Sequence, residues 1–280
     1  MTIITFKICF LTLLLLLLFW IYFKRQYLFW LFIKDIRLER TLHYLLSVLF
    51  GIVIVKNEVV LNLKIIVDYI LLNISMISAI IFSIMTNNVA DYDIDCISNK
   101  ERPLPQKMIE IANYRKLEKW FLAVSLITAA IIGYKFLLLV AAYIIVYYSY
   151  SMPPLRFKRI TFFSKTFIAI ATLICVIIGY VFVKNNLSGF PEKYIWFILF
   201  SLTPTLNFID LKDYEGAKSC GVKTLPVIFG LKKSKFIIAT FFLLSYIIVA
   251  FEFLPAIISG VLTFFLIIKE NYKYYINNSI

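Results

Sequence analysis

The sequence predicts an all-α integral membrane protein, a bundle of about nine transmembrane helices around a central cavity that opens toward two cytoplasmic loops. Three observations support this fold class. Hydrophobic residues make up 62% of the 280 residues, and the mean hydropathy of +0.88 is far above that of a soluble domain. Apolar segments alternate with short charged loops along the whole chain. Two short windows in these loops, residues 91–101 and 210–215, hold seven of the 16 acidic residues.

The apolar segments give the helices in order. They cover residues 8–23, 41–55, 59–86, 120–134, 136–148, 166–183, 194–209, 236–251 and 253–268. Several are shorter than the roughly 20 residues that cross a bilayer, so we expect them to extend into their flanks. Pro204 removes a backbone hydrogen bond and is expected to kink its helix near the cytoplasmic end. We predict one membrane domain, residues 34–280, after an extra N-terminal anchor, residues 1–33, that has no small-residue cleavage site.

Basic residues predict the orientation. The net charge is +13 at pH 7, and 23 of the 29 Lys and Arg fall in alternate loops, the stretches 24–40, 87–119, 151–165, 210–235 and 269–280. Because cytoplasmic loops carry an excess of Lys and Arg, both acidic loops are predicted to face the cytoplasm of a multi-pass protein of the cell membrane. The basic residues form no stripe of their own, which argues against nucleic acid as a partner.

The two acidic loops carry motifs of the same spacing. The first reads Asn88-x-x-Asp91-x-x-x-Asp95, and the second reads Asp210-x-x-Asp213-x-x-x-Ala217. Residues at i, i+3 and i+7 share one face of a helix, where carboxylates repel each other unless a cation joins them. We therefore predict that the motifs are two halves of one site for Mg²⁺ and a diphosphate, placed across a cavity by an internal pseudo-repeat. The alternative is that these acids are ordinary surface residues.

Magnesium prefers oxygen ligands and is usually held by one or two carboxylates, with substrate phosphate supplying further ligands. The predicted metal ligands are Asn87, Asp91, Asp95, Asp210 and Asp213, and the four aspartates are also the candidate catalytic residues. Asn87 precedes Asp91 by one helical turn, so its amide oxygen can join the row. Asp93 is expected to point elsewhere.

Basic side chains near the motifs are candidates for holding the diphosphate, because Arg binds phosphate through two parallel hydrogen bonds and Lys supplies a point charge. The diphosphate-binding candidates are Arg102, Tyr150, Arg156, Lys158, Lys212 and Lys223. Anchoring at the cytoplasmic surface is the alternative, and we accept it for Lys232, Lys233 and Lys235.

Two further polar features have structural interpretations. Lys64 and Asp68 are spaced i, i+4 in one apolar segment and are predicted to form an ion pair with a snorkelling lysine, with a transport path as the alternative. Four cysteines without a CxxC pair and a single histidine, His43, make no soft-metal site.

The motifs together resemble the UbiA superfamily of intramembrane prenyltransferases. Its members carry Asn-Asp-x-x-Asp-x-x-x-Asp followed by Arg-Pro, a Tyr-Ser-x-Pro-Pro loop with basic residues, and Asp-x-x-Asp-x-x-Gly-Asp running into Gly-x-x-Thr-Leu-Pro-Val. The matching stretches here are Asn87 to Asp95 with Arg102-Pro103, Tyr150 to Lys158, Asp210 to Ala217, and Gly221 to Val227. The resemblance extends over about residues 34–268.

The chain also departs from that pattern. Asn88 and Ala217 stand where the family has aspartates, so each motif keeps two carboxylates. Ser164-Lys165 replaces a frequent Gly-Asn, and two apolar segments follow the second motif where the family usually has three. Asn88 and Ala217 either retune the site or disable it.

The resemblance implies an enzyme that uses Mg²⁺ to transfer a prenyl group from a prenyl diphosphate to a hydrophobic or aromatic acceptor or a membrane lipid, as in quinone, chlorophyll-like or lipid biosynthesis. Metal and basic side chains would stabilise the departing diphosphate. Two alternatives stay open. One is a UbiA-type terpene cyclase or a transferase that uses a prenyl phosphate. The other is a non-catalytic membrane protein that binds isoprenoids or quinones.

Overall fold

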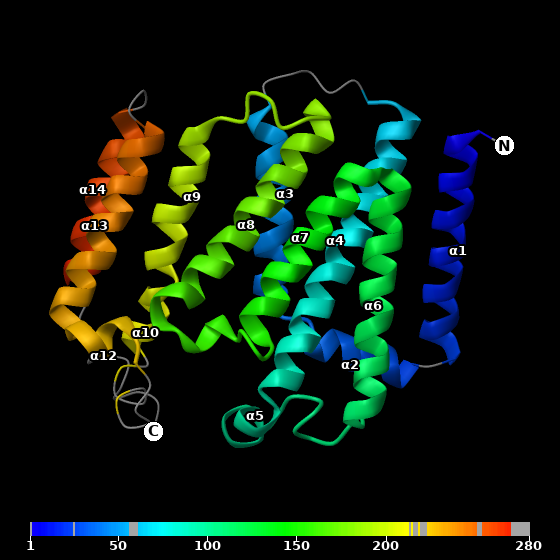
Figure 1. Cartoon of the computed structure of the whole chain (residues 1–280), viewed down its shortest axis with the longest axis horizontal. Helices are drawn as coiled ribbons and strands as arrows, with labels where there is room; N and C mark the ends of the chain where they lie inside the picture. The colour runs from blue at the N-terminus through cyan, green and yellow to red at the C-terminus, as the bar shows by residue number, and fades with distance from the viewer. Residues whose placement is uncertain are drawn as a thin grey trace. The chain divides into compact units, whose positions relative to one another are not determined.

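The computed structural model describes residues 2–24, 26–55, 61–212, 214, 218, 223–250 and 254–269. Its elements are α1 (Ile3–Lys24), α2 (Gln26–Asp35), α3 (Leu38–Ile54), α4 (Leu63–Ala90), α5 (Tyr92–Ser98), α6 (Ile111–Ile132), α7 (Tyr134–Ser151), the 3₁₀ turn η1 (Phe157–Arg159), α8 (Thr161–Lys184), α9 (Glu192–Thr205), α10 (Asn207–Lys212), α12 (Leu225–Phe229), α13 (Leu231–Ala250) and α14 (Leu254–Lys269) (Figure 1). No strand occurs in these ranges, so the predicted all-α fold is confirmed for them.

Each predicted apolar segment coincides with a long helix, namely α1, α3, α4, α6, α7, α8, α9, α13 or α14. Within the described ranges, four helices are long and apolar enough to cross a membrane by length and composition: α1, α4, α7 and the part of α8 from Ser164 to Lys184. A multi-pass membrane protein is therefore well supported. That the other helices also cross the bilayer stays a prediction.

The chain divides into two compact units. Unit 1 contains Met1–Leu155 and Ile174–Leu187, and unit 2 contains Arg156–Leu173 and Ser188–Ile280. The first acidic motif belongs to unit 1 and the second to unit 2.

Helix α4 is the central helix of unit 1 and delivers the first motif at its end. Its 28 residues are apolar on most sides, which suits a helix surrounded by others, and side chains such as Leu71, Met76 and Ile80 are fully buried. The side chain of Asn62 caps its start by accepting from the Ile65 amide at 2.9 Å. This packing fixes the position of the residues around Asn88.

Helices α3 and α8 cross at two glycines, both in unit 1. A Cβ atom on Gly51 would lie 1.9 Å from the carbonyl oxygen of Val176, and one on Gly179 would lie 1.9 Å from that of Val48. Only residues without a side chain allow two helix backbones to approach this closely.

The partner of Asp68 differs from the sequence-based expectation. Asp68 in α4 accepts from Lys7 Nζ of α1 at 2.5 Å, and Lys7 is only 4% exposed. The predicted pair with Lys64 was wrong, because a lysine from another helix reaches the carboxylate from a buried position. An ion pair within one helix could be foreseen from spacing, whereas one between α1 and α4 depends on how these helices pack.

In unit 2, the short helix α10 carries the start of the second motif. Helix α9 ends at Thr205 and α10 begins at Asn207, so the helix is interrupted two residues after Pro204, at the end where the kink was predicted. Leu211 of α10 packs into a core with Leu225, Ile238 and Ile267. These contacts hold the backbone around Asp210 against α12, α13 and α14.

Candidate functional site

The first acidic motif lies at a bend between two helices. Helix α4 ends at Ala90, and Asp91 takes a non-helical conformation with φ −106° and ψ 12° before α5 begins. Hydrogen bonds of the helical type continue through the bend, from the Asp91 amide to the Asn87 carbonyl at 3.0 Å and from the Asp95 amide to the Asp91 carbonyl at 2.8 Å. Asn87, Asp91 and Asp95 therefore follow one another on successive turns, although the helix expected to carry them is interrupted.

Asp95 is a buried carboxylate that binds one cationic side chain and one amide side chain. It is 3% exposed, forms an ion pair with Arg102 Nη1, and accepts from Asn99 Nδ2 at 2.9 Å. A predicted metal ligand and a predicted diphosphate-binding residue are thus in direct contact. Arg102 is more exposed, and its guanidinium has five donors, so it can hold Asp95 and an incoming phosphate together.

The end of α7 lies beside the start of the motif. Ser151 Oγ donates to Asn87 Oδ1 at 3.4 Å, and both side chains are buried. Next to Ser151, the half-buried ring of Tyr150 stacks edge-on against Tyr147 with the ring centroids 5.9 Å apart. The Tyr-Ser stretch singled out from the sequence therefore reaches the predicted neutral ligand Asn87.

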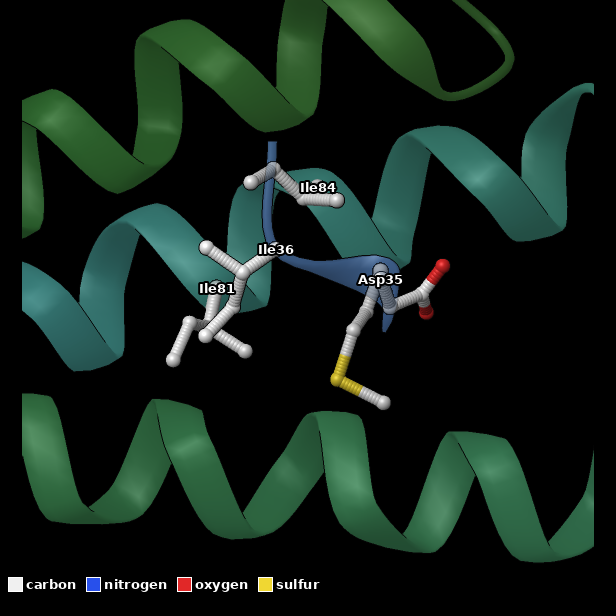
Figure 2. A pocket seen from close by; sticks show the side chains of 5 residues that line it. Asp35, Ile36, Ile81 and Ile84 are labelled. Carbon is white, nitrogen blue, oxygen red and sulfur yellow. The ribbon is translucent and has the colours of Figure 1, made fainter. Parts of the chain in front are cut away.

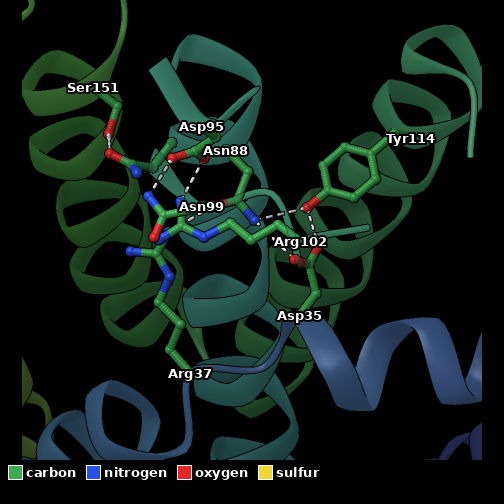
Figure 3. Close-up of polar contacts among 9 residues, drawn as sticks. Asp35, Arg37, Asn88, Asp95, Asn99, Arg102, Tyr114 and Ser151 are labelled. Atoms are coloured by element: carbon green, nitrogen blue, oxygen red, sulfur yellow. Dashed lines mark hydrogen bonds and ion pairs between the residues drawn. The ribbon is translucent and has the colours of Figure 1, made fainter. Parts of the chain in front are cut away.

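Asn88 joins a hydrogen-bond network that was not predicted from the sequence (Figure 3). Its Oδ1 accepts from Arg37 Nη2 at 2.7 Å, and its Nδ2 donates to Asp35 Oδ1 at 3.0 Å and to Tyr114 Oη at 3.1 Å. Tyr114 also donates to the other oxygen of Asp35. These four residues, called the Asn88 network below, come from α2, the α2–α3 junction, α4 and α6. The sequence offered one sign of this network, because Asp35 is the first acidic residue of the chain.

Asp35 stands in mostly apolar surroundings at the end of α2. A small pocket beside it is lined by Ile36, Ile81, Ile84 and Met85, and Figure 2 shows the carboxylate pointing away from the isoleucine side chains. Burial raises the pKa of Asp35, while its hydrogen bond from Tyr114 and the charge of Arg37 act in the opposite direction. The carboxylate thus depends on the Asn88 network for stabilisation.

Arg37 is one of three arginines near the first motif. Burial and the positive charges of Arg40 and Arg102 lower its pKa, and the negative charges of Asp95 and Asp35 oppose them, with a net value of about 10. Figure 3 shows the guanidinium groups of Arg37 and Arg102 next to each other beside Asp95. Neither Arg37 nor Arg40 was predicted as a site residue.

The second motif is described only in part. Asp210 in α10 accepts from Lys165 Nζ of α8 at 3.1 Å, within unit 2. Asp213 and Ala217 lie outside the described residues, as does the side chain of Lys212. Lys165 was not predicted to contact the motif, although it stands where the family resemblance leads one to expect an asparagine.

The other basic candidates lie on loops and short turns. Arg156 has a left-handed conformation with φ 43° just before η1, and Lys158 is half-buried within η1. Lys223 is exposed and precedes α12. Their role in binding a diphosphate stays a prediction.

The donors at the first motif suit a hard metal ion. Among the described residues, no three or more His, Cys, Asp or Glu side chains form a metal-binding group. Asn87, Asp91 and Asp95 nevertheless place one amide and two carboxylates on successive turns, and Mg²⁺ commonly takes one or two carboxylates with its other ligands from substrate phosphate and water. The residues present therefore fit magnesium arriving with a diphosphate.

Comparison with known proteins gives the family. The model of the UbiA prenyltransferase family matches residues 44–279. The chain belongs to the UbiA prenyltransferase family. The resemblance seen in its motifs is thereby confirmed.

Individual members of the UbiA family match in sequence over part of their length. The digeranylgeranylglyceryl phosphate synthase of Pyrococcus horikoshii is 30% identical over 175 residues, which are 60% of this chain and 58% of that protein. The chloroplastic 2-acyl-4-prenylphloroglucinol 6-prenyltransferase of Humulus lupulus is 29% identical over 178 residues, 58% of this chain and 42% of that protein. The chain thus matches about half the length of these curated relatives.

The fold is also that of solved UbiA structures. A UbiA homolog from Archaeoglobus fulgidus bound to DMAPP and Mg²⁺ superposes with a TM-score of 0.63 over 86% of this chain and 83% of that chain, at 24% identity. At this identity the likeness shows the shared fold.

Proposed function

We propose that this member of the UbiA family transfers a prenyl group from a prenyl diphosphate to a hydrophobic or aromatic acceptor in the membrane, with Mg²⁺ as its metal. The observation that carries the proposal is the arrangement of Asn87, Asp91 and Asp95 on successive turns with Arg102 bound to Asp95, in a chain whose family membership extends over residues 44–279. The related protein from Archaeoglobus fulgidus, bound to DMAPP and Mg²⁺, supports the same ligand pair.

Each motif has a proposed role. The metal would be held by Asn87, Asp91, Asp95, Asp210 and Asp213, with Arg102, Tyr150, Arg156, Lys158, Lys212 and Lys223 contacting the diphosphate. Bound Mg²⁺ supplies positive charge to the leaving diphosphate. Asn99 and Arg102 each bind one oxygen of Asp95, so a metal that binds this carboxylate must share it with these partners or displace one of them.

The acceptor is proposed as a class. The name of the Pyrococcus horikoshii relative indicates a prenylated glyceryl phosphate lipid, and that of the Humulus lupulus relative indicates a phloroglucinol ring. We propose a lipid or aromatic acceptor of one of these two kinds. We also propose that residues 34–280 form the catalytic domain, that residues 1–33 anchor it, and that both acidic motifs face the cytoplasm.

The test is turnover by purified full-length protein in lipid nanodiscs. Geranylgeranyl diphosphate and Mg²⁺ are supplied with either a geranylgeranylglyceryl phosphate or an acylphloroglucinol, and products are identified by mass spectrometry. Wild-type protein should join the prenyl group to one acceptor, and Asp91→Ala should lose at least about 100-fold in rate. Asp93→Ala is the matched control, because Asp93 is exposed in the same motif.

Other products would contradict the proposal. A cyclised hydrocarbon formed without acceptor would indicate a terpene cyclase. Equal activity of Asp91→Ala and Asp93→Ala would remove the metal motif from the mechanism. Binding of the diphosphate without turnover on either acceptor would favour a non-catalytic isoprenoid-binding protein.

A further inference from the structure

Asn88 makes hydrogen bonds that an aspartate at this position cannot make. Its amide oxygen accepts from Arg37, and its amide nitrogen donates to Asp35 and to Tyr114. An ionised carboxylate has no donor, so an aspartate at position 88 would face the carboxylate of Asp35 about 3 Å away without a hydrogen bond between them. The asparagine is therefore required by its neighbours, and does not simply reflect the loss of an acid.

Asp35 supplies a carboxylate beside position 88. It is 8% exposed, it contacts Asn88 directly, and Tyr114 satisfies its second oxygen. In the family pattern the acid is part of the motif itself. Here a carboxylate from α2 lies one hydrogen bond away from the motif position.

The Asn88 network holds a guanidinium beside the metal motif. Arg37 Nη2 is bound to Asn88 at 2.7 Å, and its guanidinium lies next to that of Arg102, which is paired with Asp95 (Figure 3). Two adjacent positive charges repel each other until an anion binds both. Because a guanidinium carries five N–H donors, Arg37 can donate to Asn88 and to a phosphate at once.

Arg40 gives an independent indication of an anion. Its Nη1 atom is buried and has no hydrogen-bond partner among the described residues. Buried polar groups in native proteins are nearly always paired, and an exception calls for a water or a ligand. Arg40 lies one turn beyond Arg37, close enough to influence it electrostatically. A buried donor without a partner, on a side chain close to the Arg37 guanidinium, is a suitable position for an oxygen atom of a phosphate.

We propose that Arg37 is a further phosphate-binding residue of the prenyl diphosphate site, and that Asp35 and Asn88 are positioning residues that hold its guanidinium. The ligand it binds is the diphosphate group of the donor. This inference rests on the proposed function, which puts a Mg²⁺-bound diphosphate at Asn87, Asp91 and Asp95. It also implies that Asn88, together with Asp35, retunes the site and leaves it functional.

Binding of inorganic pyrophosphate in the presence of Mg²⁺, measured by calorimetry on full-length protein, tests the role of Arg37. Arg37→Gln should weaken binding about 10- to 100-fold, the loss typical of a hydrogen bond to a charged group, and Arg37→Lys should be intermediate because it cannot form two parallel hydrogen bonds. Arg115→Gln is the control, since Arg115 is 46% exposed and its contact with Glu118 is 3.9 Å long. In turnover, Arg37→Gln should raise the KM for geranylgeranyl diphosphate more than it lowers kcat.

The two proposals fail in different ways. Wild-type protein that does not bind pyrophosphate with Mg²⁺, or binding that is unchanged in Asp91→Ala, overturns the proposed function. Wild-type protein that binds, with binding lost in Asp91→Ala but unchanged in Arg37→Gln, overturns only the inference about Arg37.

An exchange of the acid and the amide tests the positioning role. Asn88→Asp sets two carboxylates against each other and should weaken pyrophosphate binding at least about tenfold. The double variant Asp35→Asn/Asn88→Asp again has one amide and one carboxylate, and should bind within about threefold of wild type. Asn113→Asp makes the same chemical change on the exposed face of α6 and should have no effect.

The double variant keeps the test decisive if Asn88→Asp does not fold. A folded double variant that binds like wild type supports the proposal. If Asp35 and Asn88 only filled space, exchanging their amide and carboxylate groups would not be expected to restore ligand binding. A folded double variant with weak binding overturns it. So does Asn88→Asp that binds more tightly than wild type, since position 88 would then be a vacated metal-ligand position.

Discussion

Lys7 Nζ and Asp68 Oδ1 lie 2.5 Å apart, so a buried ion pair joins helix α1 to helix α4. The side chains are 5% and 13% exposed, and both belong to helices that are long and apolar enough to cross a membrane. Charges in such helices are costly and normally occur in pairs. The pair therefore gives the largely apolar first helix a preferred docking position on α4.

Removing one partner of this pair should destabilise the protein. Lys7→Met leaves the Asp68 carboxylate buried without its counter-charge, which we expect to cost about 3 kcal/mol. Lys7→Met/Asp68→Leu removes both charges and should recover most of that loss. Thermal unfolding in detergent measures the stability of the single and the double variant. Equal stability of the single variant and wild type would show that the pair does not hold α1 on α4.

Gly51→Ala should be strongly destabilising. The added Cβ would lie 1.9 Å from the carbonyl oxygen of Val176, so α3 and α8 would have to move apart, at a cost of about 3 kcal/mol. Gly133→Ala is the matched control, because a Cβ there would approach no atom closer than 3.9 Å. A fall in melting temperature is expected for the first variant only. Similar melting of both would contradict the close crossing.

Arg102→Met should affect stability more than Arg115→Met. Arg102 pairs with Asp95, whose side chain is 4% exposed, so losing the guanidinium leaves a buried charge unpaired, at about 3 kcal/mol. Arg115 is 46% exposed and lies 3.9 Å from Glu118, a buried carboxylate that also accepts a hydrogen bond from Thr86, so this ion pair should contribute less than about 1 kcal/mol. Chemical unfolding measures the free energy of unfolding that each variant loses relative to wild type. If the two lose the same stability, Arg102 has no structural role at Asp95.

The sequence was informative about helices and weaker about contacts between them. Long apolar runs predict where helices lie, because a backbone in a membrane must satisfy its own hydrogen bonds. Motif spacing likewise brought Asn87, Asp91 and Asp95 onto successive turns. Spacing could not foresee that the helix is interrupted at Asp91, because an i, i+3, i+7 pattern assumes a continuous helix.

The Asn88 network shows the same limit more clearly. Asp35, Asn88 and Tyr114 are separated by 53 and 26 residues, and no local pattern relates them. The sequence showed only that an acid was missing at position 88. The contact with Asp35 depends on how α2 packs near the end of α4, which is a property of the tertiary structure. Likewise, Lys165 and Asp210 are 45 residues apart, and their contact was not predicted.

Lys165→Met should lower the Mg²⁺ concentration needed for half-maximal activity. Lys165 Nζ lies 3.1 Å from Asp210, so a metal that binds this carboxylate must displace the ammonium group or share the carboxylate with it. The side chains are 20% and 15% exposed, and a pair with some solvent access contributes about 1 kcal/mol, which corresponds to about a fivefold change in apparent metal affinity. Lys193→Met, at an exposed position, is the control and should leave the Mg²⁺ dependence unchanged. A higher Mg²⁺ requirement in Lys165→Met would contradict competition, because it would mean that Lys165 helps to form the metal-bound state. Titration of prenyl transfer against Mg²⁺ at saturating prenyl diphosphate separates the two outcomes.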